Sequence, residues 1–395
     1  MSMKRDGWIT KCIGDCFEYI KNGANIKQEK NASGYPITRI ETLANGVFNR
    51  DRMGYANIFD VGKYCINILQ DQDILMSHIN SKAYIGRSVI YRKIDNEIII
   101  HGMNLLRLIA KKDFLNPYYA NYYFKTDSFK GDVAKIRKDA VNQSSMAISD
   151  LSKIKMPIPP LPEQSRIVEE LDQLSNIIEK KRQQLSELDN LAQSIFYDMF
   201  GDPVTNEKGW EVKSLKDIGS IITGNTPSTK DVDNYSSNDY CFVKPGDIGK
   251  DGITLINSTE YYVSEKAYLN SRKLPVGSVL VTCIGIIGKV GILLKNSICN
   301  QQINAILPNE LICSEYCAFV IMLMRHKLEV IANAPVVPII NKGDFSNIRI
   351  PLPQLNFQQL FAQKIEAIEK EKELIKQSIK ETEELFNSRM DYYFN

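Results

Sequence analysis

The sequence lacks several features that would place it in a specialised class of protein. No apolar run reaches the length of about 18 residues that a membrane-spanning helix needs. The N-terminal segment, MSMKRDGWITKCIGD, has no apolar stretch like that of a secretory signal peptide. Histidine is scarce, with 3 of 395 residues, and the formal charges nearly cancel, at +2. We therefore expect a cytoplasmic protein with no membrane segment.

The 8 cysteines do not form a recognisable metal or disulfide pattern. Cys12 and Cys16, like Cys313 and Cys317, are four residues apart, whereas zinc sites usually combine closer pairs with histidine. A chain of this length buries a core without disulfides, and cytoplasmic cysteine is usually reduced. We interpret the cysteines as small buried apolar residues. The composition, 44% apolar and 24% charged, is that of an ordinary globular protein.

Catalytic motifs are also missing. CIGIIGKVG, from Cys283 to Gly291, contains a Gly-Lys pair, but a P-loop needs Ser or Thr after the lysine and a longer glycine spacing. We interpret this segment as a turn between two strands. NPYY, at Asn116, has only part of the N-P-P-Y pattern of adenine methyltransferases, and no glycine-rich turn lies nearby. The sequence therefore favours a protein that is not an enzyme, with no metal site and no cofactor of its own.

An internal repeat organises the chain. MPIPPLPEQ, from Met156 to Gln164, has a counterpart in IPLPQLNFQQ, from Ile350 to Gln359. The offset of 194 residues that aligns them also pairs Gln164 with Gln358 and Phe200 with Phe394. In each copy a globular segment leads through a proline-rich hinge into a long helical pattern. We therefore predict a first domain at 1–158, a first helix at 159–200, a second domain at 201–352 and a second helix at 353–395.

Each predicted helix carries an apolar seam that is typical of a coiled coil. Seam residues recur at alternating intervals of four and three residues, without internal glycine or proline. Because one such helix cannot bury its seam alone, we predict that the two pair within the chain, antiparallel, as a pseudo-two-fold repeat favours. Dimerisation with another chain is the alternative. The seams comprise Ile167, Leu171, Leu174, Ile178, Lys181, Leu185, Leu188, Ala192, Ile195 and Met199, and Phe361, Ile365, Ile368, Lys372, Ile375, Ile379, Thr382, Phe386, Arg389 and Tyr393.

The two domains have the pattern of mixed α+β folds. Each begins with a tryptophan, Trp8 or Trp210, and continues with short β-like runs and helical stretches. The predicted fold class is thus α+β, with two globular domains joined by two long antiparallel coiled-coil helices. We expect strands at 73–77, 88–91, 97–100, 278–282 and 290–294, and helices near 117–126 and 314–331.

Charge is distributed unevenly between these parts. Residues 1–158 contain 24 Lys and Arg against 16 Asp and Glu, whereas residues 201–352 contain 15 of each. A basic domain attracts polyanions such as nucleic acid. Asn and Gln side chains, which read base edges, and Ser and Thr, which hold phosphates, cluster beside the basic residues. We therefore predict nucleic-acid binding; a coiled-coil scaffold whose domains bind other proteins is the alternative.

The sequence resembles the specificity (S) subunits of type I restriction–modification systems over essentially the whole chain. In the first copy the resemblance rests on YPITRIET, SHIN, HGMNLL, VNQSS and IPPLPEQ. In the second copy it rests on TGNTPS, KPGDI, TCIGIIGKVG, NQQINAI, PIINK and IPLPQ, with the terminal SRMDYYF. It implies two target recognition domains, each of which binds one half of a bipartite site in double-stranded DNA. It also implies that the helices set the half-site spacing and dock two methyltransferase (M) subunits.

The resemblance further implies a division of labour between subunits. The S subunit has no active site and holds no cofactor. The M subunits carry out adenine methylation with S-adenosylmethionine, and restriction/translocase (R) subunits, which use ATP and Mg²⁺, join the complex. A self-sufficient methyltransferase is a third alternative, and the missing cofactor motif opposes it.

Candidate DNA-binding residues come from basic stretches and from positions that match these motifs. Motif residues shared by a family whose targets differ are expected to serve as scaffold or phosphate contacts. Base-reading residues are then expected in less patterned segments, such as 47–63 and 231–244. The first-domain candidates are Arg39, Arg50, Arg52, His78, Asn80, Arg87, His101, Asn104, Arg107, Lys135, Arg137, Lys138, Asn142 and Gln143. Those of the second are Asn225, Thr226, Lys244, Thr282, Lys289, Asn300, Gln301, Gln302, Asn304, Asn341 and Lys342.

Overall fold

The chain divides into two compact units, and each contains one domain and part of both long helices. The computed structural model describes residues 7–27, 33–55, 57–140, 143–332 and 337–394. The first unit consists of Met1–Lys180 and Ser378–Asn395, and the second of Lys181–Gln377. Within the described segments, no helix is both long and apolar enough to cross a membrane.

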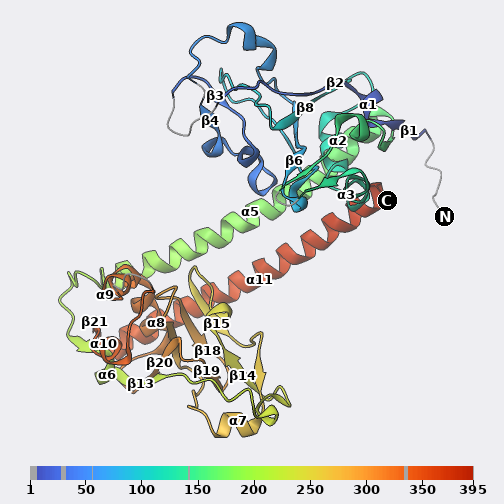
Figure 1. Ribbon diagram of the computed structural model, residues 1–395. Helices are drawn as coiled ribbons and strands as arrows, with labels where there is room; N and C mark the ends of the chain where they lie inside the picture. Colours follow the sequence, from blue (N-terminus) through green and yellow to red (C-terminus); the bar gives the residue numbers. More distant parts are fainter. Residues whose placement is uncertain (1–6, 28–32, 56, 141–142, 333–336, 395) are drawn as a thin grey trace. The chain divides into compact units, whose positions relative to one another are not determined.

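The first domain is built on a four-stranded antiparallel sheet in the order β2–β8–β5–β7, of which β2 and β8 are labelled in Figure 1. The central strands β5 (Ile74–Ser77) and β8 (Leu105–Ala110) are almost wholly buried. The outer strands are β2 (Phe17–Asn22) and β7 (Ser88–Ile90). Small sheets flank it: β1 (Ile9–Cys12) with β11 (Lys155–Ile158), β3 (Pro36–Ile37) with β4 (Gly54–Tyr55), and β6 (Ile79–Asn80), β10 (Ser144–Ser145) and β9 (Lys138–Asp139).

Short helices complete the first domain. Asn116 and Thr126 cap α2 (Pro117–Tyr123) and α3 (Asp127–Ile136), because each side-chain oxygen accepts a hydrogen bond from a backbone N–H of the first turn. The expected helix near 117–126 is therefore confirmed at α2. The expected strand at 97–100 is wrong, because only Ile100 pairs there, through isolated bridges. The other helices are α1 (Ile13–Cys16), α4 (Ile148–Leu151), η1 (Ile40–Gly46), η2 (Arg50–Arg52), η3 (Gly62–Asn67) and η4 (Lys82–Tyr84).

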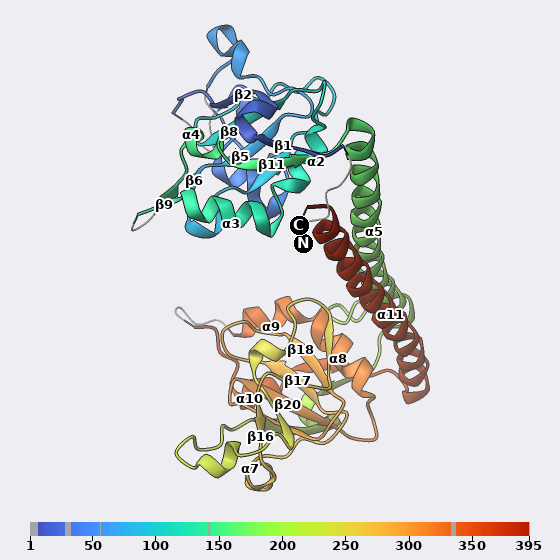
Figure 2. The same ribbon diagram turned by 90° about the vertical axis from the view of Figure 1, so that its right-hand side faces the viewer.

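The second domain is built on a five-stranded sheet in the order β13–β20–β17–β18–β15. Strands β17 (Val279–Thr282) and β18 (Val290–Leu293) confirm the two expected strands, and the segment between them joins an antiparallel pair. Helix α8 (Ser314–Leu323) packs against the sheet (Figure 2). The remaining strands of these sheets are β13 (Gly219–Thr223), β15 (Ile253–Ile256) and β20 (Ile303–Pro308), then β16 (Tyr262–Val263), β14 (Tyr240–Val243) and β19 (Ser297–Cys299), and β12 (Val212–Ser214) with β21 (Arg349–Pro351).

The helical stretch expected at 314–331 is two helices rather than one. Helix α8 ends at Leu323, Met324 leaves the helical conformation, and α9 (Arg325–Ile331) follows. The other helices of this domain are α6 (Leu215–Ile218), α7 (Glu265–Leu269), α10 (Lys342–Ser346), η5 (Val232–Tyr235) and η6 (Pro245–Asp247). All eight cysteines are free thiols, and most are buried as expected, but Cys65 is exposed.

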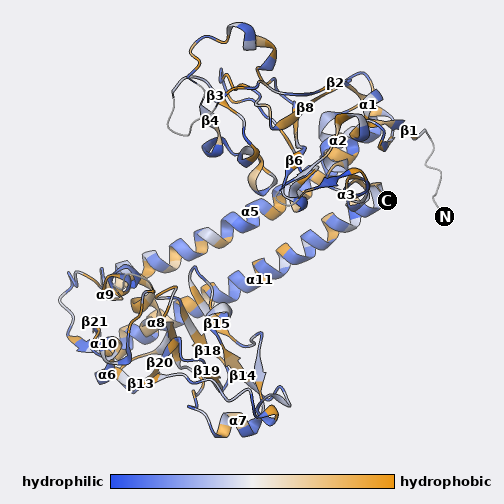
Figure 3. Cartoon of the chain, in the orientation of Figure 1, coloured by the Kyte–Doolittle hydropathy of each residue, from blue (hydrophilic) through white to orange (hydrophobic). Residues whose placement is uncertain are grey.

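The long helices are α5 (Leu161–Phe200) and α11 (Leu355–Phe394), and they pair antiparallel, as predicted. In the first unit Arg389 pairs with Glu170, and in the second unit Lys372 lies 2.8 Å from Asp189. Every residue of both predicted seams is buried or partly buried. The helices are otherwise largely hydrophilic, with separate apolar positions (Figure 3).

The end of each long helix completes the core of a domain. Phe200, at the C-terminal end of α5, packs in the second unit with its ring centroid 4.8 Å from that of Tyr316. Phe394, at the end of α11, packs in the first unit with its centroid 5.1 Å from that of Tyr119. The two phenylalanines that the repeat aligned are thus equivalent in packing as well as in sequence.

A buried glutamine fastens the start of each long helix to its domain. The Gln164 side chain accepts a hydrogen bond from the Asn116 N–H at 2.7 Å and donates to the carbonyls of Phe114 and Pro159. Gln358 repeats these bonds with Cys313, Leu311 and Pro353. Both glutamines are fully buried, so each satisfies backbone groups that would otherwise lack partners.

The proline-rich segments are more ordered than the expected hinges. Pro157 belongs to β11 and pairs with Thr10 of β1, and Pro351 belongs to β21 and pairs with Val212 of β12. Proline is tolerated there because two-stranded sheets consist only of edge strands. The Tyr119 and Tyr316 hydroxyls donate to the carbonyls of these prolines at 2.8 and 2.9 Å. Each domain is therefore joined firmly to its helix.

Candidate nucleic-acid interface

Several first-domain candidates are tied into the fold. Arg50 donates two hydrogen bonds to Glu97, which holds the pKa of that carboxyl at about 2. Arg107 is 4% exposed, with its Nε 2.7 Å from Asp73 and its Nη1 donating to the Ile66 carbonyl. The first pair ties η2 to the loop that holds Glu97, and the second ties β8 to Asp73 just before β5, so Arg50 and Arg107 have few donors left for DNA.

Two candidate histidines are buried in the same domain. His78 is 5% exposed and its Nε2 lies 2.8 Å from Nδ2 of Asn22; His101 is fully buried, with Nε2 2.9 Å from the Leu105 carbonyl. Nδ1 of each ring lacks a hydrogen-bond partner among the described residues. Burial lowers the pKa of His78 to about 4 and that of His101 to about 3. Both are therefore neutral at pH 7 and are placed as scaffold.

Other first-domain candidates are local contacts or surface residues. Arg137 pairs with Asp139 at 2.6 Å, Lys135 pairs with Asp132, and Arg39 lies 3.5 Å from Glu41. The side-chain oxygen of Asn80 accepts a hydrogen bond from the next backbone N–H. Asn142 lies outside the described residues. The candidates with exposed or partly exposed side chains and no side-chain partner in the described segments, apart from ring contacts, are Arg52, Arg87, Asn104, Lys138 and Gln143.

Most second-domain candidates hold loops together. Asn225 accepts from the Arg272 N–H at 3.0 Å, Asn304 accepts from Thr223, and Asn341 caps α10. The Thr282 hydroxyl is fully buried and accepts from the Lys289 N–H. Asn300 and Gln302 bond each other. These roles are structural, as we expected of motif residues.

Few second-domain candidates are free to meet a ligand. Lys289 Nζ donates to the Pro245 carbonyl at 2.6 Å. Lys244 Nζ lies 3.1 Å from the ring centroid of Tyr261. Thr226 and Gln301 are exposed and bond each other, and Lys342 is exposed. This pattern agrees with the neutral charge of the domain.

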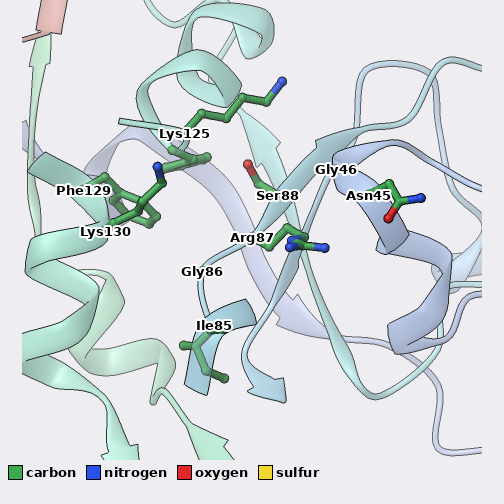
Figure 4. Close-up of a pocket in the computed structure, with 11 residues that line it drawn as sticks. Asn45, Gly46, Ile85, Gly86, Arg87, Ser88, Lys125, Phe129 and Lys130 are labelled. Atoms are coloured by element: carbon green, nitrogen blue, oxygen red, sulfur yellow. The ribbon is translucent and has the colours of Figure 1, made fainter. Parts of the chain in front are cut away.

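A basic cleft in the first domain was missed by the sequence analysis, apart from Arg87. The cleft has a volume of about 520 Å³ (Figure 4). Asn45 and Gly46 of η1 form one side, residues between Phe124 and Lys130, before and within α3, form the other, and the residues that lead into β7 lie between them. Lys125 and Lys130 join Arg87 there, although they are far apart from it in sequence. Their only sequence signal is their place after the aromatic-rich helix α2, with Lys125 just before the cap of α3 and Lys130 in its first turns.

In the part of the chain that the structure describes, no three His, Cys, Asp or Glu side chains gather in an arrangement that could hold a metal ion.

Comparisons with known proteins agree on one family. The family model of the type I restriction modification DNA specificity domain matches the chain twice, over residues 5–190 and 207–384. A relative described as the MjaX type I restriction enzyme specificity subunit, from Methanocaldococcus jannaschii, is 31% identical over 96% of this chain and 90% of its own length. The EcoR124I/EcoR124II specificity subunit of Escherichia coli is 27% identical over 62% of this chain and 63% of its own.

Solved structures show the same fold. The crystal structure of the type I restriction–modification S subunit from M. genitalium has a TM-score of 0.58 at 13% identity, and covers 100% of this chain and 98% of its own. A chain from a structural study of type I restriction–modification complex assembly has a TM-score of 0.57 at 16% identity, covering 99% and 98%.

Proposed function

This chain belongs to the family of type I restriction–modification specificity subunits, and from that premise we propose that each of its domains binds one half of a bipartite site in double-stranded DNA. On this proposal residues 1–158 and 201–352 are the recognition domains, and 159–200 and 353–395 are the conserved helices. The double match of the family model carries the proposal, because one recognition unit occurs twice in one chain. The equivalent hydrogen bonds of Gln164 and Gln358 support it, because they attach the start of each long helix to its domain in the same way.

The helices would act as a spacer and as a docking surface. The antiparallel pair is fixed by Arg389 with Glu170 and by Lys372 with Asp189, which supports a constant length between the half-sites. Outside the seam, Leu374 is 64% exposed and Leu385 50% exposed. These side chains give the outer face of α11 apolar positions that another protein could cover. We assign these faces to two methyltransferase subunits.

The chemistry would reside in the partners. The methyltransferase subunits would hold S-adenosylmethionine, and the restriction/translocase subunits would use ATP and Mg²⁺, in the cytoplasm where the host DNA is. This chain would contribute binding and orientation: phosphate contacts place the complex on DNA, and base contacts select the site.

Adenine methylation in the host tests the proposal. Sequencing of methylated adenines with and without this gene should reveal one bipartite motif that is lost on deletion. The purified complex should bind a duplex with that motif, with an affinity that falls steeply as salt rises, because phosphate contacts release counterions. Unchanged methylation after deletion, together with salt-independent behaviour, would favour a protein-binding scaffold instead.

A further inference from the structure

We propose that the basic cleft of the first domain binds the sugar–phosphate backbone of DNA, with Arg87 and Lys125 as the phosphate contacts. This proposal rests on the proposed function, and it adds where on the domain the backbone lies. The cleft lies wholly within the first unit, so its geometry depends on one domain only.

The charges that line the cleft have one sign. Its lining includes Arg87, Lys125 and Lys130 and no carboxylate. Lys130 pairs with Asp127 at 2.9 Å, but Arg87 and Lys125 have no carboxylate within 4 Å among the described residues. A concave surface with unpaired cations concentrates positive potential, which favours an anionic ligand.

Shape and chemistry favour a nucleic-acid backbone over a compact anion. The cleft, at about 520 Å³, is far larger than a phosphate group. Ile85 and Gly86 give it an apolar floor against which a sugar ring can pack. The Arg87 guanidinium lies over the Tyr84 ring at 4.2 Å, which orients it without using its donors.

Lys125 is adapted to receive a negative charge. Its side chain reaches the surface, yet packed surroundings lower its pKa, while the more distant Asp172 opposes this effect. A phosphate beside Lys125 stabilises the ammonium form. The lysine therefore gains more from an anionic ligand than a fully hydrated surface lysine does.

The corresponding place in the second domain is filled. Gly86 and Gly288 both have positive φ, of 81° and 74°, and both precede a cation at the end of a hairpin. In the second domain the Arg325 side chain packs on Gly288 and bonds Glu329 and the Lys250 carbonyl, and Lys289 is tied to Pro245. The same scaffold thus has free cations in one copy and internally paired cations in the other.

The salt dependence of DNA binding tests the proposal. The full chain, assembled with its methyltransferase subunits, is titrated against a fluorescent duplex that carries the methylated motif, between 50 and 300 mM KCl. Arg87→Ala and Lys125→Ala should each weaken binding several-fold, and each should reduce the slope of log affinity against log salt by about 1, because each removes a single cation from the phosphate backbone. The double variant should reduce it by about 2. The methylated motif should not change.

Matched variants separate charge, fold and ligand. Lys153→Ala removes an exposed lysine outside the cleft, paired with Asp150, and should leave the slope unchanged. Arg87→Lys keeps the charge and should keep the slope. Thermal unfolding shows whether each variant is folded, and Lys125→Ala replaces Arg87→Ala if the latter is not.

Three results would overturn the assignment. Unchanged slopes in both alanine variants, with normal binding by the wild-type complex, would show that the cleft does not touch DNA. A changed base in the methylated motif would make Arg87 a base-reading residue. Inorganic phosphate could instead stabilise the wild-type protein against heat and fail to stabilise Arg87→Ala, while the salt slope of DNA affinity stays unchanged. That result would make the cleft a site for a small anion. Absence of DNA binding by the wild-type complex would instead refute the proposed function.

Discussion

The two domains share internal contacts but differ in net charge and in the cations that their surfaces leave unpaired. The hydrogen bonds of Gln164 in the first domain are repeated by Gln358 in the second. The tyrosine hydroxyl bond to the carbonyl of Pro157 is likewise repeated at Pro351. The first domain, in contrast, carries an excess of eight positive charges and an open basic cleft, whereas the second is neutral. Contacts that hold a domain to its helix are thus kept, and the surface is where the copies have diverged.

The hairpin tips show the same divergence. In the first domain the tip carries Asn80 and Lys82, whereas the tip in the second domain presents Ile286, which is 55% exposed. Both tips pair with a later segment, through Asn80 with Ser144 and through Ile284 with Ile339. One backbone arrangement therefore supports a polar tip in one copy and an apolar tip in the other.

Removal of the helix-end phenylalanines is expected to have the largest effect and to separate the two units. Phe200→Ala should lower the unfolding free energy of the second unit, and Phe394→Ala that of the first, by about 3–5 kcal/mol, because each deletes a buried ring from an aromatic cluster. Calorimetry should show one transition moving in each variant. A shift of the same transition by both variants would contradict the equivalence of the two ends.

Acid should distinguish the domains next, because only the first contains buried histidines. The pKa values of His78 and His101 are about 4 and 3 in the folded protein, against about 6.5 when unfolded, so the unfolded chain binds more protons below pH 6.5. Stability is thus full above that pH and is lost as pH falls. By pH 5 the loss should be about 2 kcal/mol per histidine. The second domain has only the exposed His326.

Unfolding of both domains between pH 7.5 and 5 measures this difference, above the range where most carboxyls titrate. The variant His78→Gln with His101→Gln should flatten the pH dependence of the first transition, whatever its effect on stability at pH 7.5. Equal acid sensitivity of both transitions would show that other groups dominate.

The sequence predicted the parts of this molecule that depend on local or periodic patterns. The helix seams and the repeat follow from spacing alone, so Ile167 and Phe361 were placed correctly as buried. The prediction of a strand at 97–100 was wrong because an apolar run indicates burial rather than a strand. Ile99 and Ile100 are buried, but in a loop, through tertiary contacts. Periodicity does not distinguish these two cases.

The interface was harder to predict because it depends on pairing across the sequence. Arg50 and Arg107 look like any surface arginine in sequence, yet Glu97 and Asp73 engage them. The cleft joins Arg87 to Lys125, and nothing local signals that they meet. Which cations remain free is decided by the fold rather than by the composition.

The helix pair should show a smaller effect at Lys372, which the repeat aligns with the apolar Ile178. Lys372 is 9% exposed, and its Nζ lies 2.8 Å from Asp189 and 2.6 Å from Glu369. Lys372→Met should change the unfolding free energy of the second unit by no more than about 1 kcal/mol, because an apolar residue in the seam offsets the loss of an ion pair. Asp189→Ala should lower the unfolding free energy by more, because the buried ammonium group of Lys372 then loses one of its two carboxylate partners and keeps only Glu369. The reverse order, by calorimetry, would show that the ion pair itself stabilises the seam.

The smallest expected effect concerns Lys244, and it sharpens the contrast between the domains. The ammonium group of Lys244 lies over the Tyr261 ring, and its backbone N–H donates to Asp247 at 2.7 Å. Lys244→Met keeps the aliphatic contact and the backbone bond and loses only the cation–π attraction, worth about 0.5–1 kcal/mol at such a site. Because this charge is already engaged, the variant should reduce the slope of log DNA affinity against log salt by less than Arg87→Ala does. Equal reductions in the same titration would mean that Lys244 leaves Tyr261 to contact phosphate, and that the second domain has a local basic surface in spite of its neutral charge.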